Sequence, residues 1–449
     1  MKIIFKVSAA VFFLLIIVAI IPAFIPDEEY TSGAKQWLKE ANNPVAIADE
    51  INSFNALAGF YVEADKDMVA EGARLIAESN MRSGKSGGSS NEILKLNDYW
   101  ETLPVNIDGK SSELLYEVYK NPTGWLEDNQ ATYKELLNDN QILLTRFRQI
   151  VAMEKYSHTL KPDFNGPAIS YSGFMAIKKL DNLSIIDDFI NLDKAAAVKR
   201  LQKNINFSRL MLANSAEILE KMIALKLLSI DLQTYQVLLD HPSNTGELNF
   251  VIANLNDNER TMRNAFKGEF AAMSPTLVIG DYDEYSDNGT RNNVIQYIIM
   301  KAYLKPRSLE NRSYENVWLY GLRKEKMTLA SRDQMASMES HNATTSWQIY
   351  QDPVGYVLMA IATPSDFNYM DKIDHADAEI SLINLKSVID SRQITNDEIA
   401  GYIATLNADI NPGYAGAKFS WNNDSRELSY AIPGYINDDV PRLKININN

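Results

Sequence analysis

Cysteine is absent from this chain of 449 residues. The chain therefore cannot form disulfides, bind zinc through cysteine, use a thiol nucleophile or carry an acylated cysteine. Stability must come instead from packing of the hydrophobic residues, which make up 46% of the sequence.

Histidine and positive charge are also scarce. The four histidines, His158, His241, His341 and His375, lie far apart and form no metalloprotease motif, so each is interpreted as structural. The 44 lysine and arginine residues are outnumbered by 58 aspartate and glutamate residues, and the net charge is −14. Because phosphate backbones attract basic proteins, we expect no nucleic-acid partner.

One long apolar run stands at the N-terminus. Lys2 and Lys6 precede the uncharged stretch Val7–Ile25, and acidic residues begin at Asp27. That length crosses a bilayer as a helix, and the charge asymmetry predicts a cytoplasmic N-terminus. We expect a single-pass membrane protein, anchored through residues 7–25, with its C-terminal domain outside the cytoplasm. The alternative is a cleaved signal peptide, but the run is long and lacks a small-residue cleavage pattern.

Beyond the anchor, apolar residues recur three, four and seven apart, which is typical of helices. The predicted fold is mainly α: an N-terminal transmembrane helix, then a multi-helix exported domain with long amphipathic helices and a small C-terminal β-hairpin. The predicted regions are a membrane anchor (1–26), an N-terminal helical region (27–122) with a Gly/Ser loop (83–90), a long-helix core (123–275), an irregular acidic loop with helices (276–345), and a C-terminal helical region with the hairpin (346–449).

Three segments carry the clearest helical patterns. One helix of about thirty residues is predicted to end before Pro162. A longer one is predicted from Asp193 to His241, where the apolar stripe shifts by one position and indicates a bend or a second partner. A third is predicted from Gly246 to Ala272, with an apolar side formed by Leu248, Ile252, Leu255, Met262 and Phe266.

Strand signals are confined to short segments. Ala417–Trp421 and Glu427–Ile432 alternate in part and flank the turn-forming residues 422–425, which predicts a hairpin. Leu103–Asp108 is a further candidate strand.

One segment resembles a nucleotide-binding loop. Gly84, Lys85 and Ser86 match the end of the phosphate-binding pattern, but Ser79 stands where the pattern needs glycine. We interpret the segment as a flexible loop and expect no cofactor.

An acidic stretch offers oxygen ligands of the kind that calcium prefers. Its candidates are Asp281, Asp283 and Asp287, but an EF-hand loop would need glycine at Ser286 and glutamate at Asn292. A solvated loop is the favoured interpretation, and no metal site is predicted.

Glu259 is a polar residue on the apolar side of the third predicted helix. Arg263 follows one helical turn later, at a spacing suited to a buried ion pair. The pair is predicted to be structural rather than catalytic, and no catalytic residue is assigned.

Several stretches form a recognisable set: Asn55–Phe60, the Glu259–Glu269 helix, Leu304–Pro306, Asp352–Gly355, Ile394–Leu406, and the hairpin residues Phe419–Trp421 and Leu428–Tyr430. In these stretches the chain resembles an uncharacterised family of proteobacterial single-pass, membrane-anchored, mainly helical periplasmic proteins. The resemblance implies architecture and a location in the bacterial inner membrane with the C-terminal domain in the periplasm, but no activity, since the family has none assigned.

Two functions are compatible with these patterns. The first is a non-enzymatic envelope protein that acts through contacts with a protein partner or the envelope. The second is a metal-independent hydrolase that uses two carboxylates on saccharide or peptidoglycan, and it requires an acidic cleft.

Overall fold

The computed structural model describes residues 20–45, 47–82, 118–163, 169–244, 246, 248, 250–277, 303–325, 327, 351–352, 369–406, 419–430 and 443–446. Over these residues the chain is mainly helical with a small antiparallel sheet, which confirms the coarse fold class. Other predictions lie outside the described residues: most of the anchor (7–19), the Gly/Ser loop (83–90), the candidate strand (103–108), Asp281, Asp283 and Asp287 of the acidic loop, and His341.

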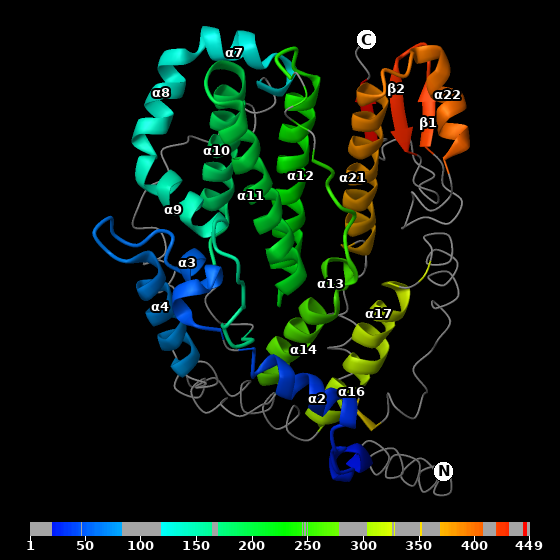
Figure 1. The fold of residues 1–449 in the computed structure, drawn as a ribbon. Coiled ribbons are helices and arrows are strands. Elements are labelled where there is room, and N and C mark those ends of the chain that lie inside the picture. The colour runs from blue at the N-terminus through cyan, green and yellow to red at the C-terminus, as the bar shows by residue number, and fades with distance from the viewer. Residues whose placement is uncertain are drawn as a thin grey trace, which may run out of the picture.

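Long helices stand side by side at the centre of the molecule (Figure 1). They are α10 (Ser172–Asn191), α11 (Lys194–Asn214), α12 (Ile218–Asp240) and α21 (Tyr369–Ser391). Among the described residues, α12 alone is long and apolar enough to cross a membrane, and 56% of its apolar window is buried within the protein. Since α12 packs against α10, α11 and α21, it has the environment of a core helix.

Charged and polar side chains are buried between α10, α11 and α12. The Lys178 ammonium contacts the carboxylate of Asp231, and their side chains are 2% and 0% exposed. Ser208 Oγ donates to Asp231 Oδ2 at 3.0 Å, and Asn182 Nδ2 lies 3.3 Å from Asp231 Oδ1. Asp231 of α12 is therefore bound by side chains of both α10 and α11.

The helix predicted to end before Pro162 is divided into three. These are α7 (Pro122–Asp128), α8 (Gln130–Asp139) and α9 (Gln141–Val151). The interruptions fall at Asn129 and Asn140, whose side-chain amides donate to the carbonyls of Trp125 at 3.0 Å and Leu136 at 2.9 Å. Asparagine competes with the helical hydrogen-bond pattern in this way, so the single-helix prediction is wrong.

The prediction of one helix from Asp193 to His241 is also wrong. The chain reverses at residues 215–217, and α11 and α12 form a helical hairpin. The Ser215 hydroxyl donates to Met211 O at 2.7 Å, and the Glu220 carboxylate accepts from Ala216 N–H at 2.6 Å. The shift in the apolar stripe marks this turn.

Residues 246–272 do not form one helix either. The described part up to 256 lacks helix, and two helices follow: α13 (Asp257–Arg260) and α14 (Arg263–Leu277). Side chains of α21 bind the non-helical backbone, because Asn384 hydrogen-bonds both N–H and C=O of Ile252 at 3.2 and 2.7 Å. The predicted apolar positions are nevertheless all buried: Leu248, Ile252, Leu255, Met262 and Phe266.

The N-terminal helices α2 (Ser32–Ala41), α3 (Ser53–Ala58) and α4 (Met68–Arg82) lie at the lower end and side of the bundle in Figure 1. Two glycines allow α3 and α4 to meet. A β-carbon at Gly72 would lie 1.8 Å from the Asn55 carbonyl oxygen, and one at Gly59 would lie 1.9 Å from that of Met68. Any larger residue at either position would push the helices apart.

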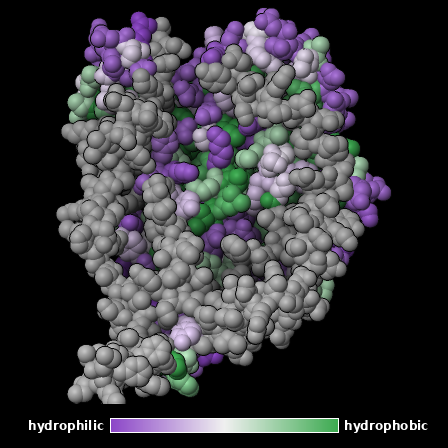
Figure 2. All heavy atoms as spheres, turned by 180° about the vertical axis from the view of Figure 1, so that it is seen from behind, coloured by the Kyte–Doolittle hydropathy of each residue, from purple (hydrophilic) through white to green (hydrophobic). Residues whose placement is uncertain are grey.

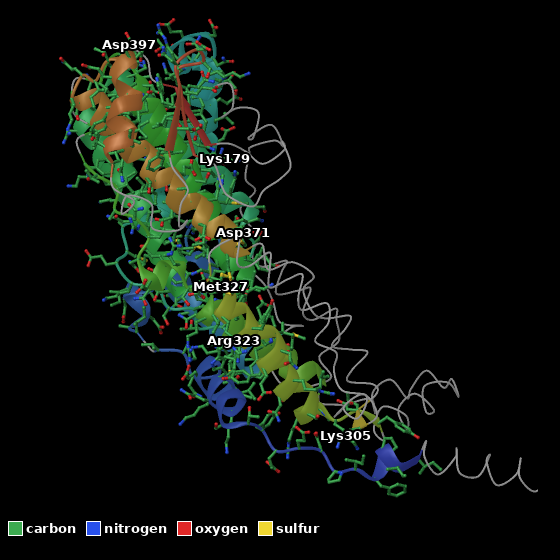
Figure 3. All side chains as sticks on the ribbon, turned by 90° about the vertical axis from the view of Figure 1, so that its right-hand side faces the viewer. Lys179, Lys305, Arg323, Met327, Asp371 and Asp397 are labelled. Atoms are coloured by element: carbon green, nitrogen blue, oxygen red, sulfur yellow. The ribbon has the colours of Figure 1, made fainter. Side chains whose placement is uncertain are left out.

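Two further helices extend along one side of the molecule. They are α16 (Pro306–Ser313) and α17 (Leu319–Glu325), joined by a π-helical turn at Tyr314–Trp318. Figure 3 shows Lys305 and Arg323 toward one end of this side and Asp397 at the other.

On the face opposite to that of Figure 1, hydrophobic residues gather near the middle and hydrophilic ones toward the upper end (Figure 2).

The sheet follows α22 (Asn396–Thr405), and its strands are β1 (Phe419–Asn422), β2 (Glu427–Tyr430) and β3 (Leu443–Asn446). Its order is β1-β2-β3 with antiparallel pairing. The predicted hairpin is confirmed, while β3 was not predicted. The sheet packs against α21. The hydrophobic core of the described structure is one cluster of buried residues that extends from Ala34 to Leu428.

Candidate functional site

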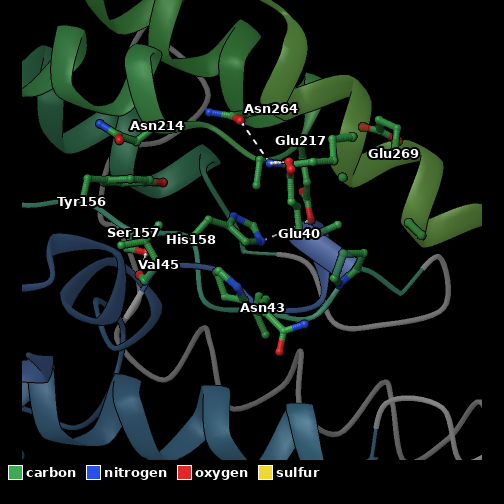
Figure 4. Close-up of a pocket in the computed structure, with 18 of the residues that line it drawn as sticks. Glu40, Asn43, Val45, Tyr156, Ser157, His158, Asn214, Glu217, Asn264 and Glu269 are labelled. Atoms are coloured by element: carbon green, nitrogen blue, oxygen red, sulfur yellow. Dashed lines mark hydrogen bonds and ion pairs between the residues drawn. The ribbon is translucent and has the colours of Figure 1, made fainter. Parts of the chain in front are cut away.

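A cavity of about 820 Å³ opens near the lower end of the bundle. It lies between the end of α2, residues 154–163, the α11–α12 turn and α14 (Figure 4). Its volume is within the range of about 300–1,000 Å³ that is usual for small-molecule sites. We therefore take it as the candidate site.

A hydrogen-bonded cluster forms one wall of this cavity. The Nδ1 atom of His158 lies 3.2 Å from both carboxylate oxygens of Glu220, and the Tyr156 hydroxyl donates to the same carboxylate. The Phe54 ring packs on the imidazole, with ring centroids 4.3 Å apart. The cluster joins the N-terminal helices to the start of α12.

The electrostatics of the cluster follow from its burial. Burial disfavours the imidazolium of His158, but the Glu220 carboxylate outweighs that effect and raises the pKa of His158. Burial, and then the charge of Glu220, raise the pKa values of Tyr156 and Tyr171. The cluster therefore combines an imidazole whose protonated form Glu220 favours with two phenols whose ionisation is opposed by burial.

Glu217 and Glu269 also line the cavity. Glu217 Oε1 lies 3.7 Å from His158 Nε2, and Glu269 Oε1 accepts from the Ile218 backbone N–H at 3.0 Å. Burial raises the pKa of both carboxyl groups, and repulsion by Glu220 and Glu269 raises that of Glu217 further. Two carboxyl groups whose ionisation is opposed by burial therefore line this wall.

Gly268 lets α14 approach the α11–α12 turn. A β-carbon at this position would lie 1.8 Å from the Ala216 carbonyl oxygen. This close contact brings Glu269 beside the first residues of α12.

The cluster is poorly placed for catalysis. The side chains of His158 and Glu220 are only 6% and 0% exposed. The oxygens of Glu220 are bound by Tyr156, by His158 and by Ala216 N–H. The cluster holds the wall together, and Glu217 and Glu269, unlike Glu220, line the cavity.

Glu259 is in a buried ion pair, but its partner is not the predicted one. Arg209 Nε and Nη2 each lie 2.7 Å from a Glu259 carboxylate oxygen. Glu259 also caps α13, because its carboxylate accepts from Asn256 N–H at 2.7 Å. Arg263 instead lies over the Trp37 ring, 5.7 Å from the centroid, because the chain turns between α13 and α14. The ion-pair partner of Glu259 is thus Arg209, and the predicted Glu259–Arg263 pairing is wrong.

We expect Glu259→Gln to lower the free energy of unfolding by about 2 kcal/mol, because hydrogen bonds to a buried charge are lost. Urea denaturation followed by circular dichroism measures the change. Arg209→Met should cost a similar amount, whereas Arg263→Met removes only a cation–π contact of about 0.5–1 kcal/mol. A larger cost for Arg263→Met than for Arg209→Met would contradict the observed pairing.

The histidines have separate surroundings. His241 borders a second cavity of about 800 Å³, where its Nε2 and Nδ1 lie 2.9 Å from Thr123 Oγ1 and 2.7 Å from Ser243 Oγ. His375 is half-buried on α21. No group of three residues suited to a metal ion occurs in the part of the chain that the structure describes.

The residues of the cavity wall were not singled out from the sequence, apart from His158, which was expected at the edge of a core. Its partner Glu220 is 62 residues away, so no local spacing connects them. Comparison with known proteins adds no candidate residues: no family model matches the sequence, and no curated protein or solved structure matches it.

Proposed function

We propose that this chain is a non-enzymatic binding protein of the bacterial envelope that holds a ligand or part of a protein partner in the cavity beside His158. The observation that carries the proposal is a cavity of about 820 Å³ whose buried acid–base groups are occupied by internal partners. Such a wall favours binding over proton transfer, which needs a group within reach of the substrate.

We further propose that residues 7–25 anchor the protein in the inner membrane, with the N-terminus cytoplasmic and the domain periplasmic. Ile21 and Phe24 in the helical residues 20–24 are 42% and 81% exposed, which suits the end of a membrane helix. The Asp27 carboxylate then accepts from the backbone N–H groups of Arg307 and Ser308, at 3.0 and 3.1 Å. A carboxylate at the start of α16 is stabilised there, so the segment after the proposed anchor is attached to the folded domain.

Protease treatment of intact and permeabilised spheroplasts tests this topology. The domain should be degraded in intact spheroplasts and should stay with the membrane after alkaline washing. A domain that is protected until permeabilisation, or that washes off, would contradict the anchor or its orientation.

The second candidate function is a metal-independent hydrolase acting on saccharide or peptidoglycan. It is favoured by the carboxyl groups of Glu217 and Glu269, which line one cavity and both have raised pKa values. A carboxyl group with a raised pKa is suited to act as a general acid.

Incubation of the full-length protein with purified peptidoglycan distinguishes the two functions. We expect no soluble fragments from the wild type when the products are analysed by mass spectrometry. Fragments that disappear with Glu217→Gln, and not with the exposed control Glu135→Gln, would establish the hydrolase and overturn the binding role.

A further inference from the structure

We propose that the cavity beside His158 binds a molecule that carries an ammonium group on an apolar body. This inference rests on the binding role proposed above and names the chemical class of the ligand. The charge of the cavity, the partners of two of its carboxylates and its exposed apolar side chains each support it.

The cavity carries more negative than positive charge. The described residues that line it include two lysines, and one of them, Lys267, has its ammonium 3.4 Å from the Glu40 carboxylate. The His158 imidazole is paired with Glu220, which lies behind the wall. The acidic side chains that line the cavity are Glu40, Glu154, Asp163, Glu217 and Glu269.

Two of these carboxylates lack a strong cationic partner. Among the described contacts, Glu217 faces only the shared imidazole of His158, and Glu269 accepts a backbone hydrogen bond. Burial disfavours the ionised forms of both and raises their pKa values, and the charges of Glu220 and Glu269 add to the shift at Glu217. A bound cation would relieve both effects, since an opposite charge within a few ångströms stabilises a carboxylate.

Apolar side chains at the cavity are exposed to an unusual degree. Val45 is 79% exposed and Leu219 is 55% exposed, and both line the cavity. Leu160 and Leu210 add further apolar surface. A bare metal ion would leave this surface in water, whereas an organic cation with an alkyl portion would cover it and gain about 25 cal/mol per Å² buried.

Three probes with six carbon atoms each test the inference: hexylamine, hexanol and hexanoate. Each is titrated calorimetrically into the full-length protein in lipid nanodiscs at pH 7.5, with empty nanodiscs as a blank. We expect hexylamine to bind at least about tenfold more tightly than hexanol, because its ammonium makes one favourable charge contact that the hydroxyl lacks. Hexanoate should bind most weakly of the three. Glu217→Gln/Glu269→Gln should reduce hexylamine binding to the level of hexanol, while Glu135→Gln on the exposed face of α8 should not.

The outcomes separate this inference from the binding role. If none of the probes binds, or if Asn214→Trp in the cavity wall and Asn138→Trp on α8 affect binding equally, the binding role of the cavity fails. If hexanol or hexanoate binds as tightly as hexylamine in the wild type, the cavity is a binding site but the cationic ligand class is wrong. A preference for hexylamine that survives in the folded double variant, with its melting temperature unchanged, would also overturn the inference.

Discussion

Replacing Lys178 with methionine is expected to lower the free energy of unfolding by about 3–5 kcal/mol, because it leaves a buried carboxylate without its counter-ion. Asp231 is fully buried between α10, α11 and α12, and the Lys178 ammonium is its cationic contact. Burial already raises the pKa of Asp231 in spite of that contact. Without Lys178 the folded protein must keep an unpaired charge or take up a proton.

Urea denaturation of the full-length protein, followed by circular dichroism, measures the loss. The matched control is Lys199→Met on α11, where the lysine is exposed and the change should stay within about 0.5 kcal/mol. A loss below about 1 kcal/mol for Lys178→Met would contradict a buried, paired lysine at this position.

The double variant Lys178→Met/Asp231→Asn should recover more than half of that loss. The charge is then removed from both partners, and the asparagine side chain can still hydrogen-bond Ser208 and Asn182. If the losses of the two single variants simply add, the two residues do not interact.

The same buried layer explains why α10 was not predicted. A helix is recognised by an apolar stripe opposite a polar face, but α10 is covered on several sides. Its buried residues include Lys178, Asp181 and Asn182 as well as leucines and isoleucines. Polar residues that point into the protein cannot be told from solvent-exposed ones by their spacing.

Apolar spacing predicted burial better than it predicted backbone conformation. Ile252 and Leu255 are buried as expected, yet they precede the helices, since Asn384 and Asp377 of α21 hydrogen-bond the backbone at these positions. Those partners are more than 100 residues away in sequence. A stripe of apolar residues indicates which side chains are inside, while distant hydrogen-bond partners decide the conformation.

Long-range pairing also limited the prediction of the site. Glu259 was recognised as a buried polar residue, but a search by helical spacing reaches only three or four residues, and Arg209 is 50 residues away. The cavity wall likewise combines Tyr156 with Glu220 across 64 residues. Sequence reasoning identified single residues of the site, and the fold was needed to pair them.

Glu379→Gln is expected to stabilise the protein at alkaline pH, by about 4 kcal/mol at pH 8. Glu379 is buried on α21, and burial raises its pKa from 4.5 to about 8, while Lys226 opposes the shift only weakly. The folded state therefore binds this proton more tightly than the unfolded state. The stability that this bound proton contributes is fully present below pH 4.5 and is lost as the pH rises through about 8.

The measurement is the difference in unfolding free energy between Glu379→Gln and wild type, taken at intervals from pH 5 to pH 9. Other carboxylates titrate in both proteins, so their contributions cancel in the difference. We expect the difference to be smallest at pH 5 and to grow in favour of the variant toward pH 9, because glutamine carries no charge that must be buried. The exposed control Glu135→Gln should show no such slope, and a flat profile for Glu379→Gln would mean that Glu379 is already ionised at pH 5 in the folded protein.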